Sequence, residues 1–247
     1  MRNLAQIVHP SCKIQENVGK CCERMSTGFN VAIDGPAGPE KALWRKKSPE
    51  QLGFLYIDTG AMYRALTYAA IQERIALDNE QQLVQLLKEN SLELTPTEFG
   101  TTVYWNDSNI TADIRSNDVN KHVSLVSSHK DVRLLMVEKQ QQLAHAKNAV
   151  LDGRDIGTYV LPNADVKVFT ASVEERAKRR HLEQLEKGQP SDLKVLEKDI
   201  AKRDELDSTR SFAPLKQAED AQVVDSTQMT IDEVIQTILA LVKEHSV

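Results

Sequence analysis

Arginine recurs in three separate segments of the chain, each time beside polar residues that could contact a phosphorylated ligand. The segments are 58–64 (DTGAMYR), 152–158 (DGRDIGT) and 203–210 (RDELDSTR). A planar guanidinium can donate two parallel hydrogen bonds to phosphate oxygens, so arginine suits phosphate binding better than lysine does. Phosphoryl transfer between two anions needs positive charge and accurate positioning rather than a covalent nucleophile. The three segments are therefore compatible with a site for phosphate binding or transfer, and each arginine taken alone is equally compatible with a solvated helix face.

A second phosphate signal lies near the N-terminus, where the apolar run 29–34 (FNVAID) leads into a Gly/Pro-rich turn. A buried strand feeding such a turn is typical of a phosphate-binding loop, whose backbone N–H groups surround an anion. Gly35 and Lys41 match the pattern G-x-x-x-x-G-K-[ST], but Glu40 replaces its second Gly and Ala42 its Mg²⁺-binding Ser or Thr. The loop residues expected to contact nucleotide phosphates are Gly35, Pro36, Ala37, Gly38 and Lys41.

Glu40 and Ala42 conflict with the rest of this loop. A carboxylate at position 40 would repel a triphosphate, and alanine offers the metal no hydroxyl. One possible set of codons for residues 38–51 encodes a different peptide when one G is inserted after the first codon and one G is deleted at the junction of codons 49 and 50. That peptide is Gly-Ala-Gly-Lys-Ser-Thr-Val-Ala-Lys-Lys-Val-Ala-Glu-Gln. That alternative reading is an intact loop followed by an apolar helix. We therefore hypothesise two compensating single-base errors or mutations that bound the segment 39–49.

The elements that must position these residues alternate along the chain. Short apolar runs typical of buried strands occur at 30–34, 55–58, 149–152, 166–169 and 222–225, with helical segments between them. This order predicts an α/β fold with a parallel sheet covered on both faces. A capping box at 230–233 predicts the start of a terminal helix with an apolar face.

One region breaks this alternation. Residues 92–111 are rich in Thr and Asn and show partial period-two alternation, which predicts a small antiparallel insert with a turn near 106–109. A helix is expected at about 116–147. We expect the insert, within about 85–125, to be a movable flap rather than part of the core. The charged segments 173–181 and 193–201 predict a solvated helical hairpin on charge pattern alone.

Length and composition limit the function classes. At 247 residues the chain can form one α/β domain with inserts, and residues 1–28 are expected to be a disordered extension or to reflect a start assigned too far upstream. A net charge of −5 argues against sequence-independent binding of a nucleic-acid polymer. The sequence contains no apolar run as long as a membrane span. Its three cysteines all fall in the first tenth of the chain, which favours a reducing, cytoplasmic setting.

The three arginine-containing segments resemble, in order and spacing, motifs of the bacterial cytidylate (CMP) kinases, and the resemblance covers roughly 29–242. It implies a three-layer P-loop NTPase fold with a five-stranded parallel sheet, a small antiparallel monophosphate-binding insert and a helical lid at about 172–207. It also implies an enzyme that moves the γ-phosphoryl group of ATP, with Mg²⁺, to CMP or dCMP. We expect the enzyme to be a monomer in the cytoplasm.

The same resemblance implies a role for each matched residue. Lys41, and Arg179 in the lid, would contact the ATP phosphates. Phosphate charge would be held by Arg64, Arg154 and Arg210, with Arg210 bridging donor and acceptor. The cytosine edge would be read by Thr59, Ser124, Arg133 and Asp155, beside Tyr63, and the sugar by Arg203 and Asp207. Asp152 would hold Mg²⁺ through water, or would cap a turn or helix; Asp34 is open to the same two readings.

Two other functions stay open at this point. A verified Glu40 and Ala42 would favour a catalytically silent relative that binds CMP and has lost ATP chemistry. A kinase for another monophosphate, such as UMP, would turn over CMP and UMP at equal rates.

Overall fold

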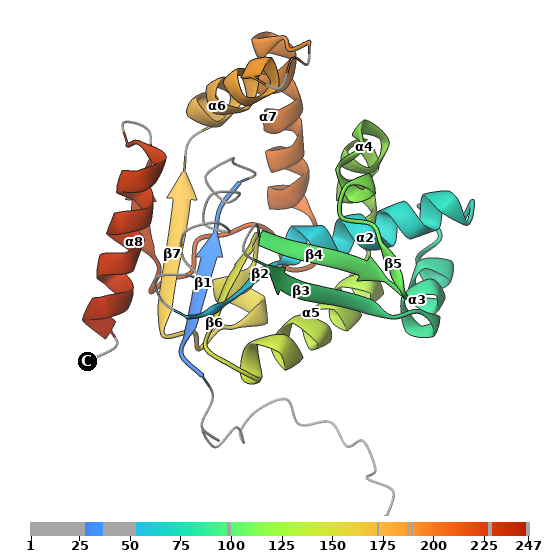
Figure 1. Cartoon of the computed structure of the whole chain (residues 1–247), viewed down its shortest axis with the longest axis horizontal. Coiled ribbons are helices and arrows are strands. Elements are labelled where there is room, and N and C mark those ends of the chain that lie inside the picture. The colour runs from blue at the N-terminus through green and yellow to red at the C-terminus, as the bar shows by residue number, and fades with distance from the viewer. Residues whose placement is uncertain are drawn as a thin grey trace, which may run out of the picture.

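A computed structural model describes residues 28–36, 53–97, 100–171, 173–186, 188, 190–226 and 229–245. At its centre is a five-stranded sheet in the order β2-β6-β1-β7-β8, with every pairing parallel (Figure 1). The strands are β1 (Asn30–Asp34), β2 (Leu55–Asp58), β6 (Ala149–Gly153), β7 (Val166–Ala171) and β8 (Gln222–Asp225). The predicted sheet is confirmed. The predicted extension up to residue 27 and the loop residues 37–52 lie outside the described residues.

Burial explains why the strands read as apolar runs. All residues of β1 and β6 are buried, because each strand has a neighbour on both sides and helices above and below. In contrast, β8 is an edge strand and buries only Val224.

Helices cover both faces of the sheet, which gives the predicted three layers (Figure 1). On one face, α8 (Ile231–His245) packs an apolar stripe against β1 and β7. Its capping box is present, since Thr230 N–H donates to the Glu233 carboxylate and Glu233 N–H to Thr230 Oγ1. The other face carries α2 (Thr59–Gln72), α3 (Glu80–Glu89) and α5 (Lys130–His145).

The insert is a three-stranded antiparallel sheet of β3 (Leu92–Thr97), β4 (Gly100–Trp105) and β5 (Ser108–Asn109). The predicted turn is confirmed, with Asn106 at a φ of 52°. The expectation that the insert stands apart from the core is wrong. Val103 and Trp105 are buried in the main apolar cluster together with α2, so packing ties β4 to the core.

The single helix predicted after the insert is also wrong, because the structure has two. A short 3₁₀ turn, η1 (Asp113–Arg115), precedes α4 (Asn117–Val126), and α5 begins at Lys130. Ser127 and Ser128 end α4 by donating their hydroxyls to the carbonyls of Ser124 and Leu125. Serine side chains that bond nearby backbone carbonyls in this way compete with helix continuation.

The predicted helical hairpin is confirmed as α6 (Val173–Glu186) and α7 (Leu193–Thr209), which rise beyond the sheet (Figure 1). Asp192 caps α7 by accepting from the backbone N–H groups of Lys194 and Val195. A two-pronged ion pair between Arg176 and Asp204 joins the helices. In the part of the chain that the structure describes, no helix combines the length and apolarity needed to cross a membrane.

Candidate active site

The three arginine-containing segments meet at the carboxyl edge of the sheet. Because β1, β2 and β6 are parallel, the residues that end them lie together, and the register pairs Asp58 with Asp152 and Asp34 with Gly153. The Thr59 hydroxyl ties two of these ends by donating to the Asp152 carbonyl at 2.6 Å. Segments far apart in the sequence therefore form one site.

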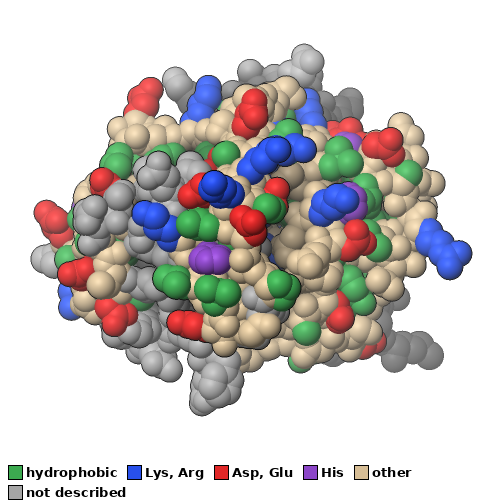
Figure 2. Space-filling model, turned by 90° about the horizontal axis from the view of Figure 1, so that it is seen from above, with side chains coloured by type: hydrophobic (Ala, Val, Ile, Leu, Met, Phe, Trp, Pro, Cys, Tyr) green, Lys and Arg blue, Asp and Glu red, His purple; other side chains and the backbone are tan. Residues whose placement is uncertain are grey.

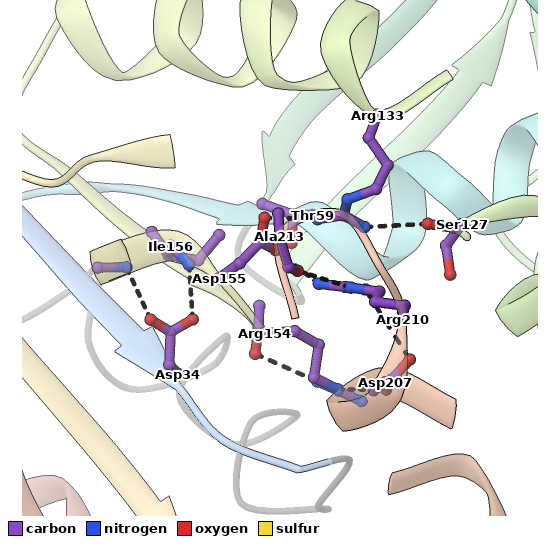
Figure 3. Close-up of polar contacts among 12 residues, drawn as sticks. Asp34, Thr59, Ser127, Arg133, Arg154, Asp155, Ile156, Asp207, Arg210 and Ala213 are labelled. Carbon is purple, nitrogen blue, oxygen red and sulfur yellow. Dashed lines mark hydrogen bonds and ion pairs between the residues drawn. The ribbon is translucent and has the colours of Figure 1, made fainter. Parts of the chain in front are cut away.

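The centre of the site is the buried carboxylate of Asp155, which lies between two arginines. Its Oδ2 accepts from Arg133 Nη2 of α5 at 2.5 Å, and its Oδ1 from Arg210 Nη2 at 3.3 Å (Figure 3). All three side chains are at least nine-tenths buried. Burial and the neighbouring Arg133 cation lower the pKa of Arg210. This trio, Arg133, Asp155 and Arg210, is called the central triad below.

A second ion pair adjoins the central triad. Arg154 Nε donates to Asp207 Oδ2 at 2.8 Å, and Arg154 Nη1 to the Gly153 carbonyl at 3.2 Å. Although burial opposes the charge of Asp207, the cations of Arg154 and Arg203 lower the pKa of this carboxyl group below its ordinary value. Asp207 is therefore ionised at neutral pH, and it connects helix α7 to the end of β6.

Arg133 is held on three sides. Besides Asp155, its Nη1 donates to the Ser127 carbonyl at 3.1 Å, and its guanidinium lies 5.4 Å from the ring centroid of Tyr63. Burial raises the pKa of Tyr63 to about 12. Burial works against the Arg133 charge, but Tyr63 and Asp155 outweigh it and raise the pKa of the guanidinium. The pair is thus a neutral phenol beside a permanent cation.

Arg64 lies near the N-terminus of α2, the helix that follows β2. Its Nη2 donates to Asp58 Oδ2 at 3.0 Å, while Asp58 Oδ1 caps α2 by accepting from the Ala61 N–H. Arg115 of η1 reaches the same Asp58 oxygen at 3.8 Å and is half-exposed. The sequence analysis missed Arg115, because it lies in no matched motif.

Asp34 has a structural role, which is one of the two roles considered for it above. Its two carboxylate oxygens accept from the N–H groups of Ile156 and Gly157, both at 2.7 Å (Figure 3). These donors begin a π-helical turn, η2 (Ile156–Val160), directly after Asp155. Asp34 therefore caps this turn. The next residue, Gly35, has a φ of 141°, a backbone conformation that favours glycine.

Some predicted site residues are placed elsewhere or lie outside the described residues. Ser124 lies half-buried on α4, and the serine of this stretch that contacts Arg133 is Ser127, through its carbonyl. Arg203 lies on α7 near Asp207, and Arg179 lies in α6. Pro36 is described, whereas Ala37, Gly38 and Lys41 are not.

Asp152 fits a water-mediated Mg²⁺ site in type and position. It is a buried carboxylate at the end of β6, beside the strand that leads into the predicted loop. Mg²⁺ keeps several waters and is usually bound through one or two carboxylates together with substrate phosphates. Within the described ranges, no three His, Cys, Asp or Glu side chains gather as a metal site of their own.

Seen from the end toward which β1 and β7 point, the surface shows basic, acidic and hydrophobic side chains interspersed (Figure 2). The arginines of the central triad are buried and do not contribute to a basic surface.

A parallel sheet whose carboxyl edge gathers arginines and buried carboxylates, beneath a helical hairpin, indicates an α/β protein of the phosphotransferase class. Comparison with known proteins makes the class specific. The chain belongs to the cytidylate kinase family, whose model matches residues 31–244. A cytidylate kinase of Shouchella clausii (strain KSM-K16) is 67% identical over 223 residues, which are 90% of this chain and 99% of the relative. Those of Geobacillus sp. (strain WCH70) and Halalkalibacterium halodurans are 53% and 55% identical over 90% and 88% of this chain, and 99% and 98% of the relatives.

Proposed function

We propose that this protein transfers the γ-phosphoryl group of ATP to CMP or dCMP, as a monomer acting on cytoplasmic nucleotides. The observation that carries the proposal is the central triad, in which residues from three distant segments meet at the carboxyl edge of the sheet. The names of the relatives support the same activity, since proteins up to 67% identical over 90% of the chain are cytidylate kinases.

The triad offers a physical basis for choosing cytosine. In our proposal the Asp155 carboxylate accepts a hydrogen bond from the exocyclic amine, and Arg133 donates to N3 or O2 of the base. Uracil has a carbonyl where cytosine has the amine, so it would place an acceptor against a carboxylate. Ser124 and Thr59 are proposed to complete this edge of the pocket, with the Tyr63 ring supporting Arg133.

Phosphate and sugar would bind beside the base pocket. Arg64, Arg154 and Arg210 are proposed to hold the phosphate groups, since guanidinium forks match phosphate oxygens. Arg64 and Arg154 keep 12% and 15% of their side chains exposed, so a ligand can reach them. Asp207, ionised beside Arg154, would accept from a sugar hydroxyl, with Arg203 next to it.

On the donor side, we propose that Gly35, Pro36, Ala37, Gly38 and Lys41 contact ATP, with Arg179 of the lid. Asp152 would hold Mg²⁺ through water. A bound Mg²⁺ supplies positive charge that neutralises the phosphate oxygens between which the group moves. Closure of α6 and α7 would exclude water from this site.

The residues at positions 40 and 42 favour a second candidate, a CMP-binding relative without kinase activity. Glu40 and Ala42 remove the second loop glycine and the hydroxyl ligand of the metal. Both candidates keep the acceptor site, so CMP binding is expected for either, and only turnover separates them.

A coupled ADP-release assay with CMP and Mg-ATP tests the proposal on two matched chains. One is the sequence as it stands, and the other restores the loop and its helix with Pro39→Ala, Glu40→Gly, Ala42→Ser, Leu43→Thr, Trp44→Val, Arg45→Ala, Ser48→Val and Pro49→Ala. We expect the restored chain to turn over CMP and dCMP, and turnover of the unaltered chain to be far lower. Inactivity of both chains would contradict the proposed kinase, and UMP turned over as fast as CMP would contradict the cytosine assignment.

A further inference from the structure

Three side chains form a partly exposed cluster beside the site. The ring of Phe212 packs edge-on against Tyr159, with centroids 4.9 Å apart and planes at 72°. Lys130 Nζ lies 5.8 Å from the centroid of the Phe212 ring. Both contacts have favourable geometry, an edge-to-face aromatic pair and a cation over a ring face. We call these three residues the aromatic clamp.

Each residue of the clamp comes from a segment that also carries one member of the central triad. Lys130 begins α5, one helical turn before Arg133. Tyr159 lies in η2, the turn that directly follows Asp155. Phe212 is two positions after Arg210, in the segment that follows α7. The same three segments are thus joined twice, once by the buried charges of the central triad and once by the two rings and the lysine of the aromatic clamp.

The segment around Phe212 contains an unfavourable backbone conformation. Ala213 has a φ of 46°, in the left-handed region that disfavours residues with a Cβ. Its carbonyl accepts from Arg210 Nε at 2.6 Å (Figure 3). Leu215 N–H donates to the Asp207 carbonyl at 2.8 Å. The orientation of Arg210 therefore depends on a turn that its surroundings must hold in place.

We propose that Phe212 is a positioning residue for the acceptor site: by packing on Tyr159 and Lys130, it holds the 210–213 turn so that Arg210 faces Asp155. The inference rests on the proposed function, because it takes Arg210 to contact CMP. Removing the ring opens no cavity in the core, since Tyr159 is 36% exposed and neither Tyr159 nor Phe212 belongs to the two apolar core clusters. The fold is therefore expected to survive the change that tests it.

The test is the affinity for CMP, which requires no donor loop, measured by titration calorimetry on four full-length chains. These are the unaltered chain, Phe212→Ala, Arg210→Ala and the double variant. A positioning role predicts that Phe212→Ala weakens CMP binding by about tenfold, or about 1.4 kcal/mol. In the Arg210→Ala background the same change should alter the affinity by less than about twofold, because the residue through which it acts is gone.

Two further variants keep the test independent of folding. Phe212→Tyr retains the ring and should bind CMP like the unaltered chain, whereas Val223→Ala removes an exposed apolar side chain of β8 and should change nothing. An equal loss from Phe212→Ala in both backgrounds, or no loss in either, would overturn the inference alone. If Arg210→Ala binds CMP normally, Arg210 does not contact CMP and the inference fails. An unaltered chain that does not bind CMP would overturn the proposed function and the inference with it.

Discussion

Asp155→Asn removes the negative charge between two buried guanidinium groups while keeping the size of the side chain. The exposed fractions of the three side chains are 2% for Arg133, 6% for Asp155 and 5% for Arg210, so solvent screens their interaction little. Breaking a buried ion pair by removing one partner typically costs about 3–5 kcal/mol, because the remaining charge stays buried and uncompensated. Asparagine keeps one carbonyl acceptor, which places the expected cost near the lower figure, about 3 kcal/mol.

Urea titration followed by circular dichroism measures this free energy of unfolding directly. For a domain of this size, a loss of about 3 kcal/mol corresponds to a fall in Tm of about 6–12 °C. The matched control is Asp118→Asn, in which the altered carboxylate is 62% exposed and lies 3.3 Å from His122. Because exposed ion pairs contribute little, the control should change the stability by less than about 0.5 kcal/mol.

A result near zero for Asp155→Asn would refute the reasoning. It would mean that the two arginines find other compensation, and that Asp155 is retained for ligand binding rather than for holding the arginines in place. A loss equal to that of the control would have the same meaning, since burial would then play no part.

Three more predictions concern neighbouring residues. Gly153→Ala should destabilise the fold by about 1–3 kcal/mol in urea, because the added Cβ would lie 2.5 Å from Ile156 Cδ1. The lowered pKa of Asp207 predicts a stabilising contribution that is full above about pH 4, the ordinary range of this group, and is lost as the pH falls through its folded value. Asp207→Asn should remove that acid dependence from urea midpoints measured at several pH values. The raised pKa of Tyr63 predicts that one of the five tyrosines ionises near pH 12. Tyr63→Phe should remove that step from an ultraviolet titration, and a titration unchanged by the substitution would contradict the burial of the phenol.

The sheet could be predicted because its strands are buried on both faces. Continuous apolar runs such as 30–34 and 149–152 reflect neighbours above, below and on both sides, and this constraint is local in the sequence. Motif spacing then placed 58–64 and 152–158 at the ends of adjacent strands. Fold class and the approximate place of the site therefore follow from patterns within short windows.

The contacts inside the site did not follow from such patterns. Asp155 pairs with both Arg133 and Arg210. These pairings depend on the distances of α5 and the end of α7 from β6, and tertiary packing sets those distances. The helix break after α4 depends on whether serine hydroxyls turn toward backbone carbonyls or toward solvent. Burial of Trp105 was hidden because its strand alternates polar and apolar residues like a solvated hairpin.

The cap formed by Asp34 has a mechanical consequence. Asp34 directly precedes Gly35, where the predicted donor loop begins, and its carboxylate holds the two backbone N–H groups that follow Asp155. One side chain thus connects the end of β1 to the backbone that follows Asp155. The distance between Gly35 and Asp155 is set by this cap and by the pairing of β1 with β6. Under the proposed function, we expect substitutions beyond Pro36 to change ATP binding without moving Asp155, so that the ATP site and the CMP site can be repaired or redesigned separately.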